Sequence, residues 1–204
     1  MAPLVVGFDL DMTLIDSRPG IVATLDALSS ETGVAIDAAL VVSRLGPVLE
    51  EEMANWYPTE QVGAASGRFR ELYTDLGVPG CSLLPGATES VEAVAAADGR
   101  TVVITAKYEP NARKCLEYVG LEVDEVVGWR WGPGKATTLT EHGAALYLGD
   151  TPGDMAAART AGALAVGVPT GPHPADQLRS AGADLVLDSL RAFPAWFAGW
   201  SGTG

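Results

Sequence analysis

The chain has 204 residues, 48% of them hydrophobic, which is enough for one domain with a full core and a small insertion. Its 26 acidic residues outnumber 13 lysines and arginines, and the formal charge of −13 argues against binding to a nucleic-acid backbone. The N-terminus lacks the basic segment of a signal peptide, and no apolar run approaches the length of a membrane span.

The two cysteines, Cys81 and Cys115, lie outside any CxxC pair and away from a histidine at ligand spacing, so we expect no zinc site. The simpler interpretation is two thiols in a reducing cytoplasm, and a disulfide between them is the alternative. The thiols favour a cytoplasmic location. We also expect either a monomer or a homodimer, with no nucleic-acid or membrane partner.

The first element of the chain is a short apolar run at residues 5–8, which predicts a buried strand. Asp9 and Asp11 follow it, two residues apart, and in an extended chain such residues share a face. Two carboxylates on one face repel each other, so a proton or a cation is expected between them. The pair suits a hard-cation site or a nucleophile with a general acid, and the alternative is an acidic turn.

Residues 16–80 predict a block of helices and no strand. Ser17 is expected to cap a helix that stops at Gly33, and Asp37 to cap a second helix that breaks at residues 46–47. A third helix is expected over residues 49–56. Thr59 is expected to cap a fourth, which ends at Gly77.

After residue 84 the pattern changes to strands alternating with helices, many of which begin at a proline and end at a glycine. Strands are expected over 101–104, 126–127, 145–148, 164–168 and 185–187, and helices over 88–97, 110–120, 135–142, 152–162 and 174–182. The alternation predicts an α/β fold with a doubly wound parallel sheet. Residues 1–15 and 84–204 would form the core, with residues 16–83 a small helical cap inserted after the first strand.

Ligands of open α/β sheets bind beyond the carboxyl ends of the strands, where several polar residues of this chain are expected. Thr105 and Asp150 each follow a predicted strand, as do Asp9 and Asp11. Asp154 lies in the first turn of the next helix, where interaction with the helix dipole is the alternative role. Four acids at one sheet edge need a counter-charge, and Mg²⁺ with oxygen ligands is the natural one.

At this point the sequence resembles the haloacid dehalogenase-like superfamily. The residues that carry the resemblance are Asp9-Leu10-Asp11-Met12-Thr13-Leu14, Thr105, Lys135 and Gly149-Asp150-Thr151-Pro152-Gly153-Asp154. The block at residues 16–83 is similar to the cap of the phosphoglycolate phosphatase-like branch. Met12 departs from the pattern, because glycine is commoner there, and we interpret it as a tolerated variation.

The resemblance implies a Rossmann-like core and a magnesium-dependent phosphatase that acts on a small phosphorylated metabolite. Asp9 would be the nucleophile and Asp11 the general acid and base. Thr105, with backbone N–H groups such as that of Ala106, would hold the phosphoryl oxygens. Lys135 would neutralise charge beside Asp9. The ligands of Mg²⁺ would be Asp9, the main-chain carbonyl of Asp11, Asp150 and Asp154.

Other functions remain alternatives. A dehalogenase is disfavoured by Asp11, and a phosphonate hydrolase by the absence of lysine from residues 16–80. A phosphomutase shares the core and a similar cap, so it stays the main alternative. A receiver-like signalling domain also groups acids, a threonine and a lysine, but it has no helical insertion. A dinucleotide-binding module would need a GxGxxG motif after the first strand.

Substrate selectivity is expected from the cap and from the loop after Thr105. Arg44 precedes a Gly-Pro break and is the candidate for a substrate carboxylate or second phosphate, with a surface arginine as the alternative. Lys107 resembles a lysine that faces the substrate under the cap in the phosphoglycolate phosphatase-like branch. His173 either lines the same mouth or faces water.

Overall fold

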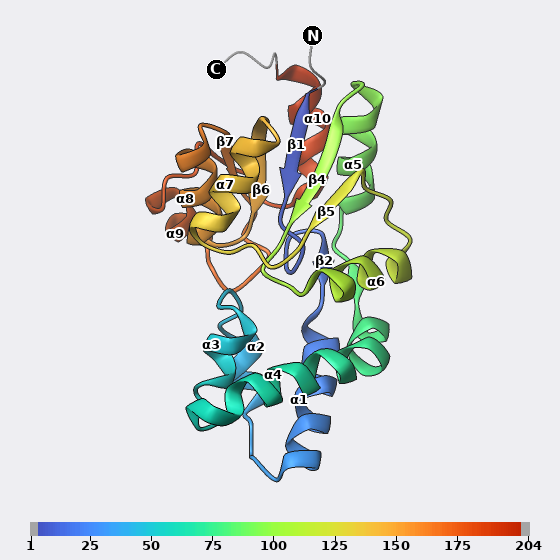
Figure 1. Ribbon diagram of the computed structural model, residues 1–204. Coiled ribbons are helices and arrows are strands. Elements are labelled where there is room, and N and C mark those ends of the chain that lie inside the picture. The colour runs from blue at the N-terminus through green and yellow to red at the C-terminus, as the bar shows by residue number, and fades with distance from the viewer. Residues whose placement is uncertain (1–3, 201–204) are drawn as a thin grey trace.

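The computed structural model describes residues 4–200, and its centre is a six-stranded sheet (Figure 1). The strands are β1 (Val5–Phe8), β4 (Arg100–Ile104), β5 (Glu125–Val127), β6 (Ala144–Gly149), β7 (Leu164–Gly167) and β8 (Leu185–Val186). Their order is β5-β4-β1-β6-β7-β8 and every neighbouring pair is parallel, which confirms the predicted doubly wound fold. After β1 the chain adds β4 and β5 on one side of this strand and then β6, β7 and β8 on the other. A ligand crevice is expected where the direction reverses, beside β1.

Helices cover both faces of this sheet, and the alternation of side chains along β1 shows why. Val6 and Phe8 point into one apolar cluster, and Val5 points into the other. The first cluster includes residues of α5 (Ala87–Ala96), α6 (Glu109–Val119) and α10 (Phe193–Gly199). The second includes residues of α7 (Pro133–Glu141), α8 (Pro152–Ala161) and α9 (Ala175–Ser180). Both faces of the strands are therefore buried, as their continuous apolar sequences predict.

The predicted helical block lies beyond the carboxyl ends of the strands (Figure 1). It contains α1 (Arg18–Thr32), α2 (Ala38–Val42), α3 (Leu49–Met53) and α4 (Thr59–Leu72), then a π-helical turn at Tyr73–Gly77 and a 3₁₀ turn at Val78–Gly80. Helix α1 packs directly on the π-helical turn. The approach is so close that a Cβ on Gly20 would lie 2.0 Å from the carbonyl oxygen of Gly77, so only glycine fits at this position. Residues 16–83 remain our proposed extent of the cap.

A short antiparallel ribbon joins this block to the core, and the sequence did not predict it. Strand β2 (Ile15–Asp16) pairs with β3 (Ser82–Leu83), so Ile15 faces Leu83 and Asp16 faces Ser82. Within residues 16–80, where no strand was expected, Asp16 is the one residue of this ribbon, so the expectation is wrong at that position. Strands of two residues are too short to show an alternating pattern, which is why sequence periodicity missed them.

The helix caps agree only in part with the expectations. The Asp37 carboxylate accepts a hydrogen bond from the backbone N–H of Leu40, as predicted. Ser17 occupies the cap position of α1 without making a cap hydrogen bond, and Thr59 lies inside α4, whose cap position is Pro58. Helix α10 was not predicted at all. Within residues 4–200, none of the helices combines the length and apolarity needed to cross a bilayer.

Candidate active site

A cavity of about 200 Å³ lies between the carboxyl ends of the strands and the helical block. Every site residue expected from the sequence lines it: Asp9, Asp11, Arg44, Thr105, Ala106, Lys107, Lys135, Asp150 and Asp154. His173 is not among the lining residues; it is half-buried in the loop before α9 (Ala175–Ser180), and its Nδ1 lies 3.0 Å from Oε1 of Gln177 in that helix. The cavity therefore gathers the candidate residues from distant parts of the chain and leaves His173 outside.

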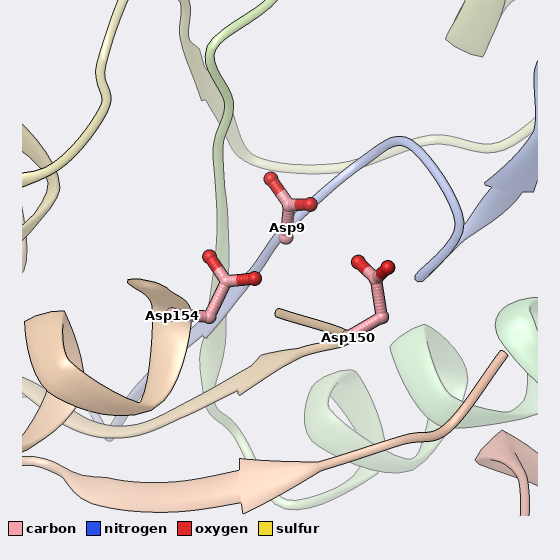
Figure 2. Close-up of side chains that lie close together, drawn as sticks. All are labelled: Asp9, Asp150 and Asp154. Atoms are coloured by element: carbon pink, nitrogen blue, oxygen red, sulfur yellow. The ribbon is translucent and has the colours of Figure 1, made fainter. Parts of the chain in front are cut away.

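Three carboxylates meet at the floor of the cavity. Asp9 follows β1, Asp150 follows β6 and Asp154 lies in the first turn of α8; one oxygen of each lies within 4.8 Å of the others. Figure 2 shows the three side chains converging from these elements. The sheet register produces this meeting, because the backbone N–H of Asp9 donates to the carbonyl of Leu148 at 2.8 Å. All three residues are buried, so their charges are poorly screened by solvent.

Lys135 supplies a positive charge in this acidic cluster. Its Nζ lies 2.8 Å from Oδ1 of Asp9 and 2.6 Å from Oδ1 of Asp154. Burial lowers the pKa of Lys135, but the charges of Asp154 and Asp9 outweigh burial, so the pKa is well above its usual value. The ammonium group therefore stays charged and holds the two carboxylates together.

The buried carboxylates are held in place by neighbours that the sequence analysis did not single out. Thr13 Oγ1 donates to Oδ1 of Asp150 at 3.2 Å. The backbone of Gly171 packs so close to Asp150 that a Cβ there would lie 1.8 Å from Oδ2. Thr151 and Asp154 form a capping box at the start of α8, with Thr151 Oγ1 2.6 Å from Asp154 Oδ2. The Thr-x-x-Asp spacing was a sequence signal for this last contact.

Burial and mutual repulsion change the protonation of the cluster. Burial raises the pKa of Asp9 to about 7 despite the opposing effect of Lys135, and the charges of Asp154 and Asp11 add to the rise. Burial also raises the pKa of Asp150 well above its usual value, with the charges of Asp9 and Asp154 acting in the same direction. One ammonium group does not neutralise three carboxylates, so the site can accept a further cation.

Asp11 has a different environment from the three clustered acids. Its Oδ1 accepts hydrogen bonds from Ser17 Oγ at 2.5 Å and from Lys107 Nζ at 2.7 Å. The Ser17 hydroxyl thus donates to Asp11 and makes no hydrogen bond with the N-terminus of α1. The charge of Asp11 outweighs the effect of burial on Lys107 and raises the pKa of this lysine above its usual value. Among residues 4–200, no side chain donates to Oδ2 of Asp11, so this oxygen is available to a ligand.

Thr105 and Ala106 follow β4 on the other side of Asp9. Thr105 is buried, and its Oγ1 accepts a hydrogen bond from the backbone N–H of Lys107 at 3.1 Å, which leaves the hydroxyl proton to donate elsewhere. The backbone N–H of Thr105 donates to Val127, which fixes the loop against β5. This geometry suits a loop that presents hydrogen-bond donors to an anion in the cavity.

Arg44, the candidate for contact with a substrate carboxylate or second phosphate, lines the cap side of the cavity but already has a partner within the cap. Its guanidinium group pairs with both carboxylate oxygens of Glu52, at 2.7 Å and 3.1 Å. Trp56 Nε1 also donates to Glu52 at 2.8 Å. Glu52 was not predicted as a site residue, because a partner eight positions away and beyond the end of α2 leaves no periodic signal.

The two cysteines lie together outside the acidic cluster. The Sγ atoms of Cys81 and Cys115 are 3.3 Å apart, both residues are buried, and both are thiols in the structure. The structure therefore has the reduced pair that we took as the simpler interpretation.

The fold and the site together define an α/β protein in which a lysine and a hydroxyl lie beside a buried cluster of carboxylates that could hold a cation. A comparison with known families identifies the class further. The profile of haloacid dehalogenase-like hydrolases matches residues 6–159, and a second profile of the same kind matches residues 136–193. The chain belongs to the haloacid dehalogenase-like hydrolases, as the sequence resemblance indicated, and it is an enzyme of the phosphatase type.

Individual relatives support this assignment over the whole chain. A phosphoglycolate phosphatase of Rhodospirillum rubrum is 31% identical, and the match covers 95% of this chain and 90% of the relative. A probable phosphatase, IndB, of Dickeya dadantii is 29% identical, with 93% and 91% covered. The structure of a haloacid dehalogenase-like hydrolase from Streptococcus pneumoniae superposes with a TM-score of 0.82 at 24% identity, covering 96% of this chain and 98% of that one. This last similarity concerns the fold alone.

Proposed function

We propose that the chain is a magnesium-dependent phosphomonoester hydrolase that acts on a small phosphorylated metabolite through an aspartyl-phosphate intermediate. The observation that carries the proposal is the contact of Lys135 with Asp9 inside the buried acidic cluster. A nucleophilic carboxylate needs an adjacent positive charge to accept the approach of an anionic phosphate, and Lys135 supplies it. The cytoplasm remains our proposed location, and a monomer or homodimer our proposed assembly.

The donor set fits Mg²⁺, which prefers carboxylate oxygens and retains several waters. Asp9, Asp150 and Asp154 bring three buried carboxylates within 4.8 Å of one another, and Asp11 contributes through its main-chain carbonyl in our proposal. Burial, together with the charges of the neighbouring carboxylates, raises the pKa of Asp9 to about 7 and the pKa of Asp150 well above its usual value, so a cation bound here would favour the ionised forms. When bound, the cation would lower the repulsion between phosphate and carboxylates and polarise the phosphoryl group.

In the first chemical step, a carboxylate oxygen of Asp9 attacks phosphorus and forms the aspartyl-phosphate bond. The bond from phosphorus to the alcohol oxygen breaks, and Asp11 gives its proton to that oxygen, so the alcohol leaves neutral. The hydroxyl of Thr105 and nearby backbone N–H groups donate to the phosphoryl oxygens as their charge develops. Lys135 compensates the charge at Asp9.

In the second step, the Asp11 carboxylate takes a proton from a water molecule, which attacks the same phosphorus atom. The bond between phosphorus and Asp9 breaks, so inorganic phosphate is released and the carboxylate of Asp9 is restored. Lys107 and Ser17 hold Oδ1 of Asp11, which directs Oδ2 to both proton transfers in our proposal.

The experiment that tests this function incubates the purified protein with Mg²⁺ and a panel of phosphomonoesters and measures released inorganic phosphate. Asp9→Asn protein is the matched control, since the amide has the same shape but cannot attack phosphorus. Release of phosphate that requires both Mg²⁺ and Asp9 is expected. Transfer of phosphate between positions of a sugar phosphate, without net release, would favour the phosphomutase alternative.

A further inference from the structure

The cap side of the cavity is predominantly apolar, and this bears on which alcohol the enzyme releases. The inference rests on the function proposed above, because it concerns the group attached to the phosphate. The side chains that face the cavity from the helical block include Leu25, Val41, Leu45, Leu49, Met53 and Phe69. Tyr108 and Trp131 add aromatic surface, and Trp131 is 45% exposed. A leaving group that projects from the phosphate towards the cap therefore meets hydrocarbon.

The cationic side chains on the cap side already have anionic partners. Arg44 pairs with Glu52 through two hydrogen bonds, and the side chain of Glu52 is only 8% exposed. A bidentate pair of this kind is directional, and Trp56 fixes the carboxylate from the other side. A substrate carboxylate would have to displace Glu52, which would then remain buried without its counter-charge.

Arg70 is held in the same way. It pairs with Glu50, and its guanidinium carbon lies 5.8 Å from the ring centre of Tyr108 and 5.2 Å from that of Trp129. Its side chain is only 15% exposed. Stacking and pairing together leave this cation little freedom to turn towards a ligand.

The cations at the strand ends are used as well. Lys135 bridges Asp9 and Asp154, and Lys107 lies against Asp11. Among residues 4–200, the cavity therefore offers positive charge to the phosphate site and no unpaired lysine or arginine to a second anionic group. Burial of a carboxylate against the cap without a partner would carry a large desolvation penalty.

We propose that this enzyme prefers phosphate monoesters of uncharged, predominantly apolar alcohols, and discriminates against esters that carry a carboxylate, including phosphoglycolate. The paired Arg44 and Glu52 are the specificity-determining residues, because they give the cap wall no net charge. On this proposal the chain differs in its preferred substrate from the relatives that are named phosphoglycolate phosphatases.

Two pairs of substrates of matched size test the proposal. In one, 4-methylbenzyl phosphate is compared with 4-carboxybenzyl phosphate, and in the other, ethyl phosphate with 2-phosphoglycolate. In each pair, kcat/KM is expected to be at least tenfold higher for the ester without a carboxylate. The reason is the cost of burying the carboxylate against the cap without a counter-charge. Equal or higher kcat/KM for the carboxylated members would overturn the inference and leave the phosphatase function intact.

Glu52→Gln tests the role of the ion pair, because it frees the charge of Arg44 while keeping an acceptor for Trp56. The ratio of kcat/KM for carboxylated over neutral substrates should rise several-fold. Glu31→Gln is the control: Glu31 also pairs with a cap arginine, Arg68, and neither residue lines the cavity. An unchanged ratio in Glu52→Gln, or the same rise in Glu31→Gln, would contradict the assignment.

A binding measurement keeps the inference independent of turnover. Asp9→Asn protein should be stabilised more in thermal unfolding by 4-methylbenzyl phosphate than by 4-carboxybenzyl phosphate at equal concentration. If no phosphomonoester is hydrolysed by the unaltered enzyme, the proposed function fails, and this binding preference alone decides the inference. Stronger stabilisation by the carboxylated ligand would reject it.

Discussion

The ammonium group of Lys107 lies 2.7 Å from Oδ1 of Asp11, the carboxylate that we assign to proton transfer. Lys107 also lies 4.5 Å from the ring centre of Tyr73, so it is fixed between the strand end and the helical block. The sequence led us to expect that this lysine faces the substrate and discriminates among substrates. From the contact with Asp11 we infer a second task for Lys107, which is to position the carboxylate that we propose as the proton donor to the leaving alcohol.

This contact predicts a difference between Lys107 and Lys135. Lys107→Met should lower kcat on ethyl phosphate by about tenfold or more, with a smaller effect on p-nitrophenyl phosphate, whose leaving group needs no proton. Lys135→Met should lower kcat on both substrates by roughly a hundredfold, because it removes a charge beside the nucleophile. Steady-state kinetics decide between them, and equal losses on both substrates for Lys107→Met would refute the link to proton transfer.

The nucleophile gives a second prediction. Asp9→Asn should reduce turnover by about a thousandfold or more, while the far-ultraviolet circular dichroism stays that of the folded protein. The unaltered enzyme, quenched with acid during turnover, should carry phosphate on the peptide that contains Asp9. Measurable turnover at the normal rate in Asp9→Asn would rule out the covalent mechanism.

The third prediction concerns metal removal and pH. In the metal-free protein the pKa of Asp9 is about 7, above its unfolded value, so the protonated carboxyl favours folding. This contribution is present below about pH 4 and is lost as the pH rises through 7. The melting temperature of the metal-free protein should therefore fall between pH 5 and 8, and Mg²⁺ should restore it along with activity.

Asp150→Asn provides the variant for this measurement. Because the pKa of Asp150 is also raised, removal of its charge should increase the melting temperature of the metal-free protein at pH 8 by a few degrees. The same variant should lose most of the stabilisation by Mg²⁺ and most of the activity. Asp26→Asn, at an exposed position of α1, is the control and should behave as the unaltered protein. Full activity in excess chelator would disprove the requirement for metal.

The fourth prediction uses Met12, which has a φ of +62° and is 1% exposed. This left-handed conformation explains why glycine is commoner there in the family, and it shows that methionine is strained at this position. Met12→Ala and Met12→Gly both remove the side chain, so their difference reports the backbone alone. The glycine variant should be more stable than the alanine variant by about 1 kcal/mol in urea unfolding. The opposite order would show that the backbone is not strained.

Much of the fold could be predicted from the sequence, because the relevant signals are local. Apolar runs such as Val5–Phe8, and helix ends such as Gly120 and Gly162, depend on a few neighbouring residues. The order of strands then places Asp9, Asp150 and Thr105 at one edge of the sheet by a general rule of α/β proteins. The sequence therefore sufficed to predict which residues of the strand ends meet.

The contacts that set selectivity were not predictable in the same way. Arg44 appeared free in the sequence, and only the folded cap brings Glu52 against it. Ser17 stands where a helix cap is expected, yet its hydroxyl donates to Asp11 and not to the helix. The sequence of the following helix does not predict this partner. The hydrogen-bond partner of such a side chain depends on which groups the fold brings near it, and sequence periodicity and spacing do not show this.

The ribbon of β2 and β3 brings the two ends of the helical block together, since Ile15 pairs with Leu83 and Asp16 with Ser82. For the sheet, the residues between β2 and β3 are equivalent to one long loop, and the pairing of these two strands closes it. The entropy of closing such a loop grows only slowly with its length. The length of the block therefore adds little to the entropic cost of closing the ribbon, and contacts such as that of Lys107 with Tyr73 fix how the block lies over the site. We therefore expect that substitutions in the part of the block that faces the cavity change selectivity without moving Asp9 or Asp150, which follow strands of the sheet.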